Sequence, residues 1–162
     1  MYQTTGAVEI SDAIHPIGRA ALRKEGTDAI IVTWGTMVSI SLQAALALET
    51  SGLDIGVLDL RWLSPLDDTA IRQTVLEAQG RVVVVHEANL TGGFGAEIVA
   101  RIHEMLAEEL PLTIKRVATP NTRMPAAPVL SSALLPNVDR IAAAVRAVIE
   151  THSPKLEFIS TR

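Results

Sequence analysis

The chain has 162 residues, a formal net charge of −4 at pH 7 and no cysteine. This length suits one domain with a full hydrophobic core. The 14 Lys and Arg residues form no basic stripe, which argues against nucleic acid or an anionic membrane as a partner. Without cysteine there is neither a disulfide framework nor a thiolate metal site. The polar N-terminus MYQTTGAVEISD shows no signal-peptide pattern, so we expect a cytoplasmic protein.

The pattern predicts five strands separated by stretches of helical period, which is typical of a mainly parallel sheet flanked by helices. Residues 1–18 come first and follow neither period. Continuous β-branched runs such as VVVV at 82–85 indicate strands that are covered on both faces, as parallel strands are in a three-layer fold. In chain order the predicted strands are Ala20–Lys24, which is weak and polar, Asp28–Trp34, Asp54–Leu60, Arg81–Glu87 and Leu112–Ala118.

Four helices are predicted from apolar residues at helical spacing. Asp67 precedes the second helix as a candidate N-cap, and Asp68 meets the positive end of its dipole. Pro136 precedes the fourth helix, close to its start. The four apolar faces are Val38, Leu42, Ala45 and Leu46; Ile71, Val75 and Ala78; Ile98, Ile102, Met105 and Leu106; and Val138, Ile141, Ala142, Val145 and Ile149.

The proline-rich stretch TPNTRMPAAPVLSSALLP, residues 119–136, is predicted to be irregular because its prolines lack backbone donors. After about residue 150 the helical period is lost. We therefore expect residues 1–18 to be an interdomain lead-in and residues 19–150 to be the folded domain. Residues 151–162 are expected to be a tail that is flexible or appended.

The segment TGGFGAEI contains G-x-G-x-x, but Ile98 stands where a dinucleotide fingerprint needs its third glycine. No lysine follows to suggest a P-loop. We favour close packing: Gly92, Gly93 and Gly95 let the start of a helix approach a neighbouring backbone. Nucleotide binding is the less favoured alternative.

The two His-Glu pairs, at His86 and His103, lack the second histidine of a zinc-binding H-E-x-x-H helix. There is no G-x-S-x-G elbow, and the carboxylates are spread over helix faces. The sequence therefore assigns no catalytic, cofactor-binding or metal-ligating residue. His86, at the carboxyl end of a central strand, either titrates or donates a hydrogen bond at a crevice, or is a structural histidine.

Four blocks carry a family resemblance: Gly18–Val38, Val57–Ile71, Val82–Ile98 and Leu134–Ile141. Their order and spacing resemble the C-terminal domain of the beta subunit of thiamine diphosphate-dependent 2-oxo acid dehydrogenases, a relative of the transketolase C-terminal domain. The resemblance covers nearly the whole chain. It does not distinguish enzymes for pyruvate, branched-chain 2-oxo acids and acetoin.

The resemblance implies a three-layer α/β/α fold with a five-stranded mixed sheet, mostly parallel, whose first strand is an antiparallel edge. Two predicted strands then become neighbours, so that Gly35, Thr36, His86 and Glu87 line a crevice at a topological switch point. In the family, the alpha subunit and the N-terminal domain of the beta subunit hold thiamine diphosphate and Mg²⁺. We therefore expect no cofactor in this chain, and no activity from the chain alone.

The resemblance also implies an assembly role, in which two beta subunits pack together with alpha subunits and help to dock the lipoyl acyltransferase. Phe94, Arg123, Met124 and Pro125 are the interface candidates, although burial of Phe94 in its own domain is an equally good interpretation. A hypothesis of a different class is an independent module that binds a small ligand in the switch-point crevice.

Overall fold

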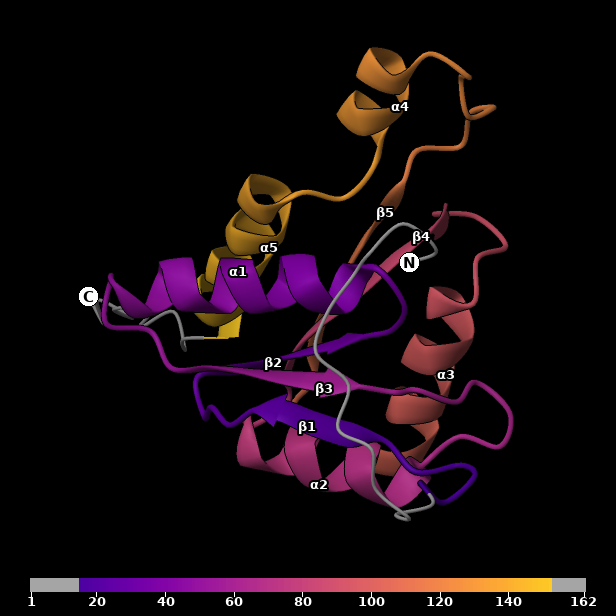
Figure 1. Cartoon of the computed structure of the whole chain (residues 1–162). Coiled ribbons are helices and arrows are strands. Elements are labelled where there is room, and N and C mark those ends of the chain that lie inside the picture. The colour runs from indigo at the N-terminus through magenta and orange to yellow at the C-terminus, as the bar shows by residue number, and fades with distance from the viewer. Residues whose placement is uncertain (1–14, 153–162) are drawn as a thin grey trace, which may run out of the picture.

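The computed structural model describes residues 15–152, which form one five-stranded mixed sheet between two layers of helices (Figure 1). The order across the sheet is β1-β3-β2-β4-β5, and only β1, antiparallel to β3, breaks the parallel arrangement. The predicted three-layer fold and its antiparallel edge strand are both confirmed. The strands are β1 (Ala21–Lys24), β2 (Ala29–Thr33), β3 (Ile55–Asp59), β4 (Arg81–Asn89) and β5 (Thr113–Thr119).

Four helices cover the two faces of the sheet (Figure 1). Successive residues of a strand point to opposite faces, so each central strand contributes to two cores. In β2, Ile31 packs with the helices of one face and Ile30 with those of the other. This double burial explains the continuous apolar runs in the sequence. On one face lie α1 (Met37–Glu49) and α5 (Val138–His152), and on the other α2 (Asp68–Glu77) and α3 (Gly95–Leu106).

The prediction that Leu46 lies on the buried face of α1 is wrong, because its side chain is 56% exposed. Apolar residues occur on most sides of this helix, so the sequence pattern alone does not identify the face that meets the sheet. The side that packs on the sheet includes three small residues, which allow the helix to approach closely. The buried residues of α1 are Met37, Ser41, Ala44, Ala45 and Leu48.

A further helix, α4 (Pro128–Leu134), lies in the proline-rich segment, so the prediction of irregular structure is wrong for these residues. Pro128 stands in the first turn, where its fixed φ and missing N–H are tolerated. Ala127 before it is extended, as the residue before a proline tends to be. No residue of α4 is buried, and the helix projects from the body of the domain (Figure 1).

The predicted lead-in and tail lie mostly outside the described residues. Residues 151 and 152 continue α5, and residues 1–14 and 153–162 are not described. Among the helices of residues 15–152, none combines the length and the apolar composition needed to cross a bilayer.

Asp67 caps α2, as predicted. Its Oδ1 accepts a hydrogen bond from the backbone N–H of Ala70 at 3.1 Å, and its Oδ2 accepts one from the N–H of Ala20, also at 3.1 Å. One carboxylate therefore starts a helix and fixes the chain that leads into β1. Asp68 follows in the first turn, where a negative charge stabilises the positive end of the helix dipole.

Replacing Asp67 with Ala should lower the free energy of unfolding by about 1–2 kcal/mol, because the N-cap acceptor is lost. Asp67→Asn retains one acceptor oxygen and should lose less. Urea unfolding followed by circular dichroism measures both variants, with Asp139→Ala, an exposed residue in the first turn of α5, as the control. If the Asn variant were as unstable as the Ala variant, the charge and not the cap would carry the effect.

Candidate functional site

Three rings meet where β2 and β4 end, and we call Trp34, His86 and Phe94 the aromatic cluster. The rings of Trp34 and His86 are stacked, with centroids 5.4 Å apart and an angle of 4° between their planes. Phe94 meets Trp34 edge-on, at 6.2 Å and 89°. Because β2 and β4 pair in register, each strand delivers its ring to the same place. The cluster therefore occupies the switch point of the sheet.

Two buried threonines hold the backbone on either side of His86. The hydroxyl of Thr33, in β2, donates to the carbonyl oxygen of Val85 at 3.0 Å. The hydroxyl of Thr119, in β5, donates to the carbonyl oxygen of Glu87 at 2.6 Å. Both neighbouring strands thus fix the end of β4, and the position of the imidazole is set by the sheet.

The His86 side chain is 1% exposed, and neither ring nitrogen has a hydrogen-bond partner among the described residues. Burial lowers the pKa of His86 below its ordinary value of 6.5, and the positive charge of Arg116 lowers it further. The imidazole is therefore neutral at physiological pH, and it packs as a flat ring between an indole and the start of α3.

Gly93 and Gly95 leave room for that ring. A Cβ on Gly95 would overlap Cδ2 and Nε2 of His86, and a Cβ on Gly93 would lie 2.7 Å from Cε1. The sequence predicted a neighbouring backbone as the close contact. At Gly93 a backbone atom is indeed nearest, because a Cβ there would overlap the carbonyl oxygen of Asn89, whereas at Gly95 the imidazole is the nearest neighbour. Gly92 differs, because nothing lies within 4 Å of its Cβ position and its φ is +74°. Close packing is therefore the wrong interpretation for Gly92, where the left-handed backbone favours glycine.

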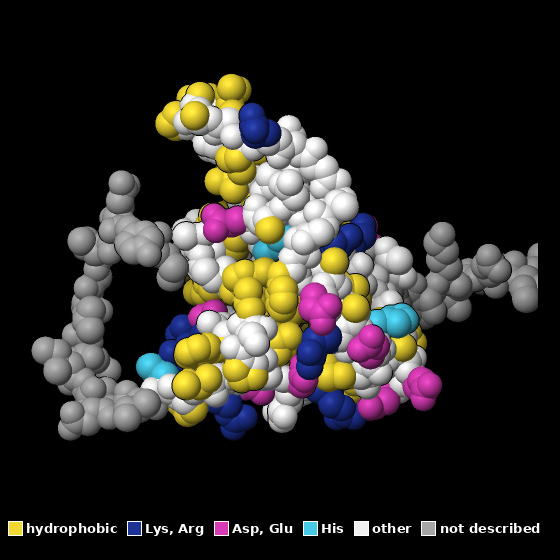
Figure 2. All heavy atoms as spheres, turned by 90° about the vertical axis from the view of Figure 1, so that its right-hand side faces the viewer, with side chains coloured by type: hydrophobic (Ala, Val, Ile, Leu, Met, Phe, Trp, Pro, Cys, Tyr) yellow, Lys and Arg dark blue, Asp and Glu magenta, His cyan; other side chains and the backbone are white. Residues whose placement is uncertain are grey.

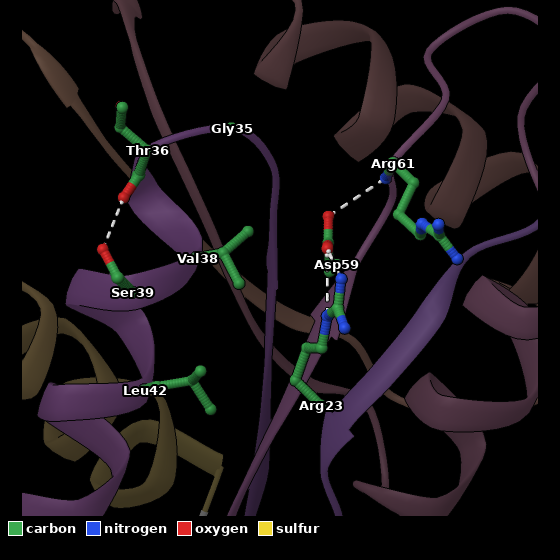
Figure 3. Close-up of a pocket in the computed structure, with 8 residues that line it drawn as sticks. All are labelled: Arg23, Gly35, Thr36, Val38, Ser39, Leu42, Asp59 and Arg61. Atoms are coloured by element: carbon green, nitrogen blue, oxygen red, sulfur yellow. Dashed lines mark hydrogen bonds and ion pairs between the residues drawn. The ribbon is translucent and has the colours of Figure 1, made fainter. Parts of the chain in front are cut away.

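The structure divides the four residues predicted for the crevice. Gly35 and Thr36 line an open groove of about 810 Å³ (Figure 3), whereas Glu87 is exposed and His86 lies below the surface. The groove opens beside α1, β3 and β1, and not between β2 and β4. Its other lining residues are Arg23, Val38, Ser39, Leu42, Asp59 and Arg61.

Asp59 organises the polar side of this groove. Its Oδ2 accepts hydrogen bonds from Nη2 of Arg23 at 2.8 Å and Nε at 3.1 Å, and its Oδ1 accepts one from the backbone N–H of Arg61 at 3.1 Å. Figure 3 shows the side chain of Arg61 directed away from this carboxylate. The one buried acid of the groove is therefore already paired. Within residues 15–152, no three His, Asp or Glu side chains are grouped as metal ligands would be.

The predicted interface residues lie near the same end of the sheet. Phe94 is half-buried in the aromatic cluster, so part of its ring packs inside its own domain. Arg123 and Met124 are exposed in the segment between β5 and α4, and Pro125 is half-buried. Trp34 directly precedes Gly35 but was not among the residues predicted to line the crevice, although an aromatic residue directly after an apolar strand was the available signal.

The transketolase C-terminal domain family model matches residues 18–141. The chain belongs to this family. The 2-oxoisovalerate dehydrogenase subunit beta of Bacillus subtilis is 37% identical over 146 residues, which are 90% of this chain and 44% of that protein. The pyruvate dehydrogenase E1 component subunit beta of the same organism is 40% identical over 134 residues, 83% of this chain and 41% of that protein. The transketolase C-terminal domain described here thus spans less than half the length of these relatives.

Among solved structures, a split-gene transketolase described as an inactive beta4 tetramer aligns with a TM-score of 0.74 and 27% identity, covering 90% of this chain and 46% of that chain. A Pichia stipitis transketolase aligns with a TM-score of 0.58 and 14% identity, over 84% of this chain and 18% of that one. The second likeness concerns the fold alone.

The contact between Gly95 and His86 predicts an unusual glycine effect. Ala normally stabilises a helical position by roughly 0.5–1 kcal/mol relative to Gly. Gly95→Ala should instead lower the free energy of unfolding by about 1–3 kcal/mol, because its Cβ overpacks against the imidazole. In a His86→Ala background the same substitution should be neutral or stabilising. Denaturant unfolding of the four proteins measures the coupling, and equal effects in both backgrounds would refute the packing argument.

The low pKa of His86 predicts loss of stability in acid. The unfolded chain binds the proton more readily than the folded one, so this contribution is complete above about pH 6.5 and is lost as the pH falls below that value. The melting temperature should therefore fall more steeply between about pH 7.5 and pH 5 in the wild type than in His86→Phe, which keeps a ring on Trp34. Parallel melting curves for the two proteins would show that His86 does not contribute.

Proposed function

We propose that this chain is the non-catalytic C-terminal domain of the beta subunit of a 2-oxo acid dehydrogenase, and that it serves subunit assembly. The main support is sequence identity: the chain is 37–40% identical to such beta subunits. The aligned residues make up most of this chain but less than half of the length of those subunits. The parent enzyme would oxidatively decarboxylate pyruvate or a branched-chain 2-oxo acid, or act on acetoin.

The structure of the switch point supports a non-catalytic role. In many α/β folds a ligand enters the crevice at this place. Here Trp34, His86 and Phe94 fill it with rings, and the end of β4 is fixed by hydrogen bonds from both neighbours. What this end of the sheet offers instead is apolar surface, which suits contact with another protein.

The cofactors of the parent enzyme would be thiamine diphosphate and Mg²⁺, held by its alpha subunit and by the N-terminal domain of its beta subunit. The described residues of this chain do not fit that pair. The only buried acid of the groove, Asp59, is paired with Arg23, and the glycine loop is packed against His86. The partners would be a second beta subunit, alpha subunits and the lipoyl acyltransferase, in the cytoplasm.

A small-ligand module is the second candidate, and the groove of Figure 3 favours it. Its volume of about 810 Å³ lies in the range of small-molecule pockets. The guanidinium of Arg61 is directed away from Asp59 and has Nδ1 of His15 at 3.4 Å from its Nη1, and its other N–H groups could bind an anionic ligand.

A chimaera tests the assembly role. Residues 15–152 of this chain would replace the corresponding part of the Bacillus subtilis 2-oxoisovalerate dehydrogenase beta subunit. We expect the chimaera to purify with the alpha subunit and to decarboxylate its 2-oxo acid, whereas the chain alone should give no heat of binding with thiamine diphosphate and Mg²⁺. A folded chimaera that fails to assemble would refute the assembly role. Calorimetric binding of the cofactor to the chain alone would refute its non-catalytic character.

A further inference from the structure

The segment Pro120–Asn137, which we call the arm, leaves the domain after β5 and returns before α5 with α4 at its tip. The side chains of Val129 and Leu130 on α4 are 80% and 58% exposed. Figure 2 shows hydrophobic side chains on this projecting part and a second group on the body below it. The arm therefore presents an apolar surface that its own domain leaves uncovered.

The base of the arm is fixed by Arg140 of α5. Its Nη2 donates to the carbonyl oxygen of Ala118 at 2.7 Å, where β5 leads into the arm. Its Nη1 donates to the carbonyl oxygens of Leu134 and Leu135 at 2.9 and 3.1 Å, where the arm returns. One guanidinium thus joins both ends, so the arm is preorganised and would lose little conformational entropy on binding.

A second set of contacts ties the arm to the loop that follows β4. Oδ1 of Asn121 accepts a hydrogen bond from the N–H of Thr91 at 2.9 Å, and its Nδ2 donates to the Thr91 hydroxyl at 2.6 Å. The N–H of Leu90 donates to the carbonyl oxygen of Thr119 at 2.9 Å. These bonds hold the arm in one direction relative to the end of the sheet.

That end of the sheet carries the second apolar surface, which we call the sheet-end patch and define as Trp34, Leu90 and Phe94. Leu90 is 38% exposed, and the two aromatic residues are half-buried. The arm of the same copy does not cover this patch by burying α4 on it, since no residue of α4 is buried. Among residues 15–152, both surfaces are therefore left uncovered.

The charge distribution favours a second copy of the chain as the partner that covers them. Residues Met124–Val138 contain no ionisable side chain, in a chain whose net charge is −4. An uncharged segment can approach the net negative body of a second copy without bringing like charges into contact. A two-fold contact is self-complementary, so an arm and a patch that belong to one chain can each meet their counterpart in a second copy.

We propose that two copies exchange arms, with α4 of each copy packed on the sheet-end patch of the other. This inference rests on the proposed assembly function and names the surface through which the beta-type chains meet. In the reciprocal exchange, α4 and the sheet-end patch are covered in both copies. A contact between the two α4 helices would leave the sheet-end patch of each copy exposed.

The absence of cysteine from the chain allows a direct test of this pairing. Full chains carrying Val129→Cys and Leu90→Cys are mixed and treated with a short bifunctional maleimide. The mixture should form crosslinked dimers in clear excess over either variant alone. A mixture of Val129→Cys with Leu46→Cys, an exposed site on α1, is the control. Equal crosslinking in that control, or within Val129→Cys alone, would overturn the exchange.

Sedimentation velocity gives an independent readout. The double variant Val129→Ser, Leu130→Ser should raise the dissociation constant of the dimer by about tenfold or more, equivalent to about 1.4 kcal/mol. Its monomer should melt as the wild type does, because neither side chain is buried. Leu22→Ser with Leu46→Ser removes two other exposed leucines and should leave the dimer unchanged.

Two outcomes would overturn the exchange: a wild-type chain that stays monomeric at the highest concentration, or a double variant that dimerises like the wild type. Neither would by itself refute the assembly function, which the chimaera tests through binding of the alpha subunit. If the chimaera assembles but the chain does not dimerise, α4 contacts another part of the enzyme.

Discussion

The placement of one neutral imidazole at the end of the central strands constrains the rest of this domain. His86 is held by the backbone of β4, whose end is fixed by the hydroxyls of Thr33 and Thr119. Its ring can enter only because two positions at the start of α3 lack a Cβ. Trp34 then covers the other side, and Phe94 meets the indole edge-on. The result is a switch point filled with rings, which displaces the open groove toward β3 and β1.

Magnitudes show why this arrangement depends on close packing. A buried polar atom without a partner costs roughly 1–3 kcal/mol, and His86 has two such nitrogens among the described residues. A favourable pair of rings contributes only about 0.5–1.5 kcal/mol beyond the area that it buries. Stacking on Trp34 therefore does not offset the lost hydrogen bonds by itself. Burial of apolar surface by Trp34, Phe94 and the first turn of α3 has to supply the difference.

The sequence predicted well those features that depend on local period. Double burial makes the strands continuous apolar runs, so Ile30, Ile31 and the valines of β4 identify central parallel strands without any knowledge of contacts. The N-cap at Asp67 was also predictable from the sequence, since capping depends on the type of residue that directly precedes a helix. The antiparallel edge came from the family resemblance together with a polar first strand.

The errors concern features that depend on contacts between distant segments. Leu46 lies on a helix with apolar residues on most sides, and only the sheet decides which side is buried. The segment that contains Pro128 was predicted to be irregular because its prolines lack backbone donors, but a proline in the first turn of a helix needs no such donor. Close packing holds at Gly93 and Gly95 but not at Gly92, and no local pattern identified the ring of His86 as the neighbour of Gly95.

The arm is held in place differently from the core, because hydrogen bonds at its base and not burial of its side chains fix its conformation. Arg140 and Asn121 fix its base through backbone carbonyls and one N–H, while Val129 and Leu130 leave most of their surface uncovered by the described residues. The hydrogen bonds at the base fix the direction in which the arm projects. The apolar side chains at its tip contribute favourable free energy only when a partner removes them from water. This division is expected of an element that serves assembly. The conformational entropy of ordering the arm is lost during folding, so that part of the cost is not incurred again when a partner binds.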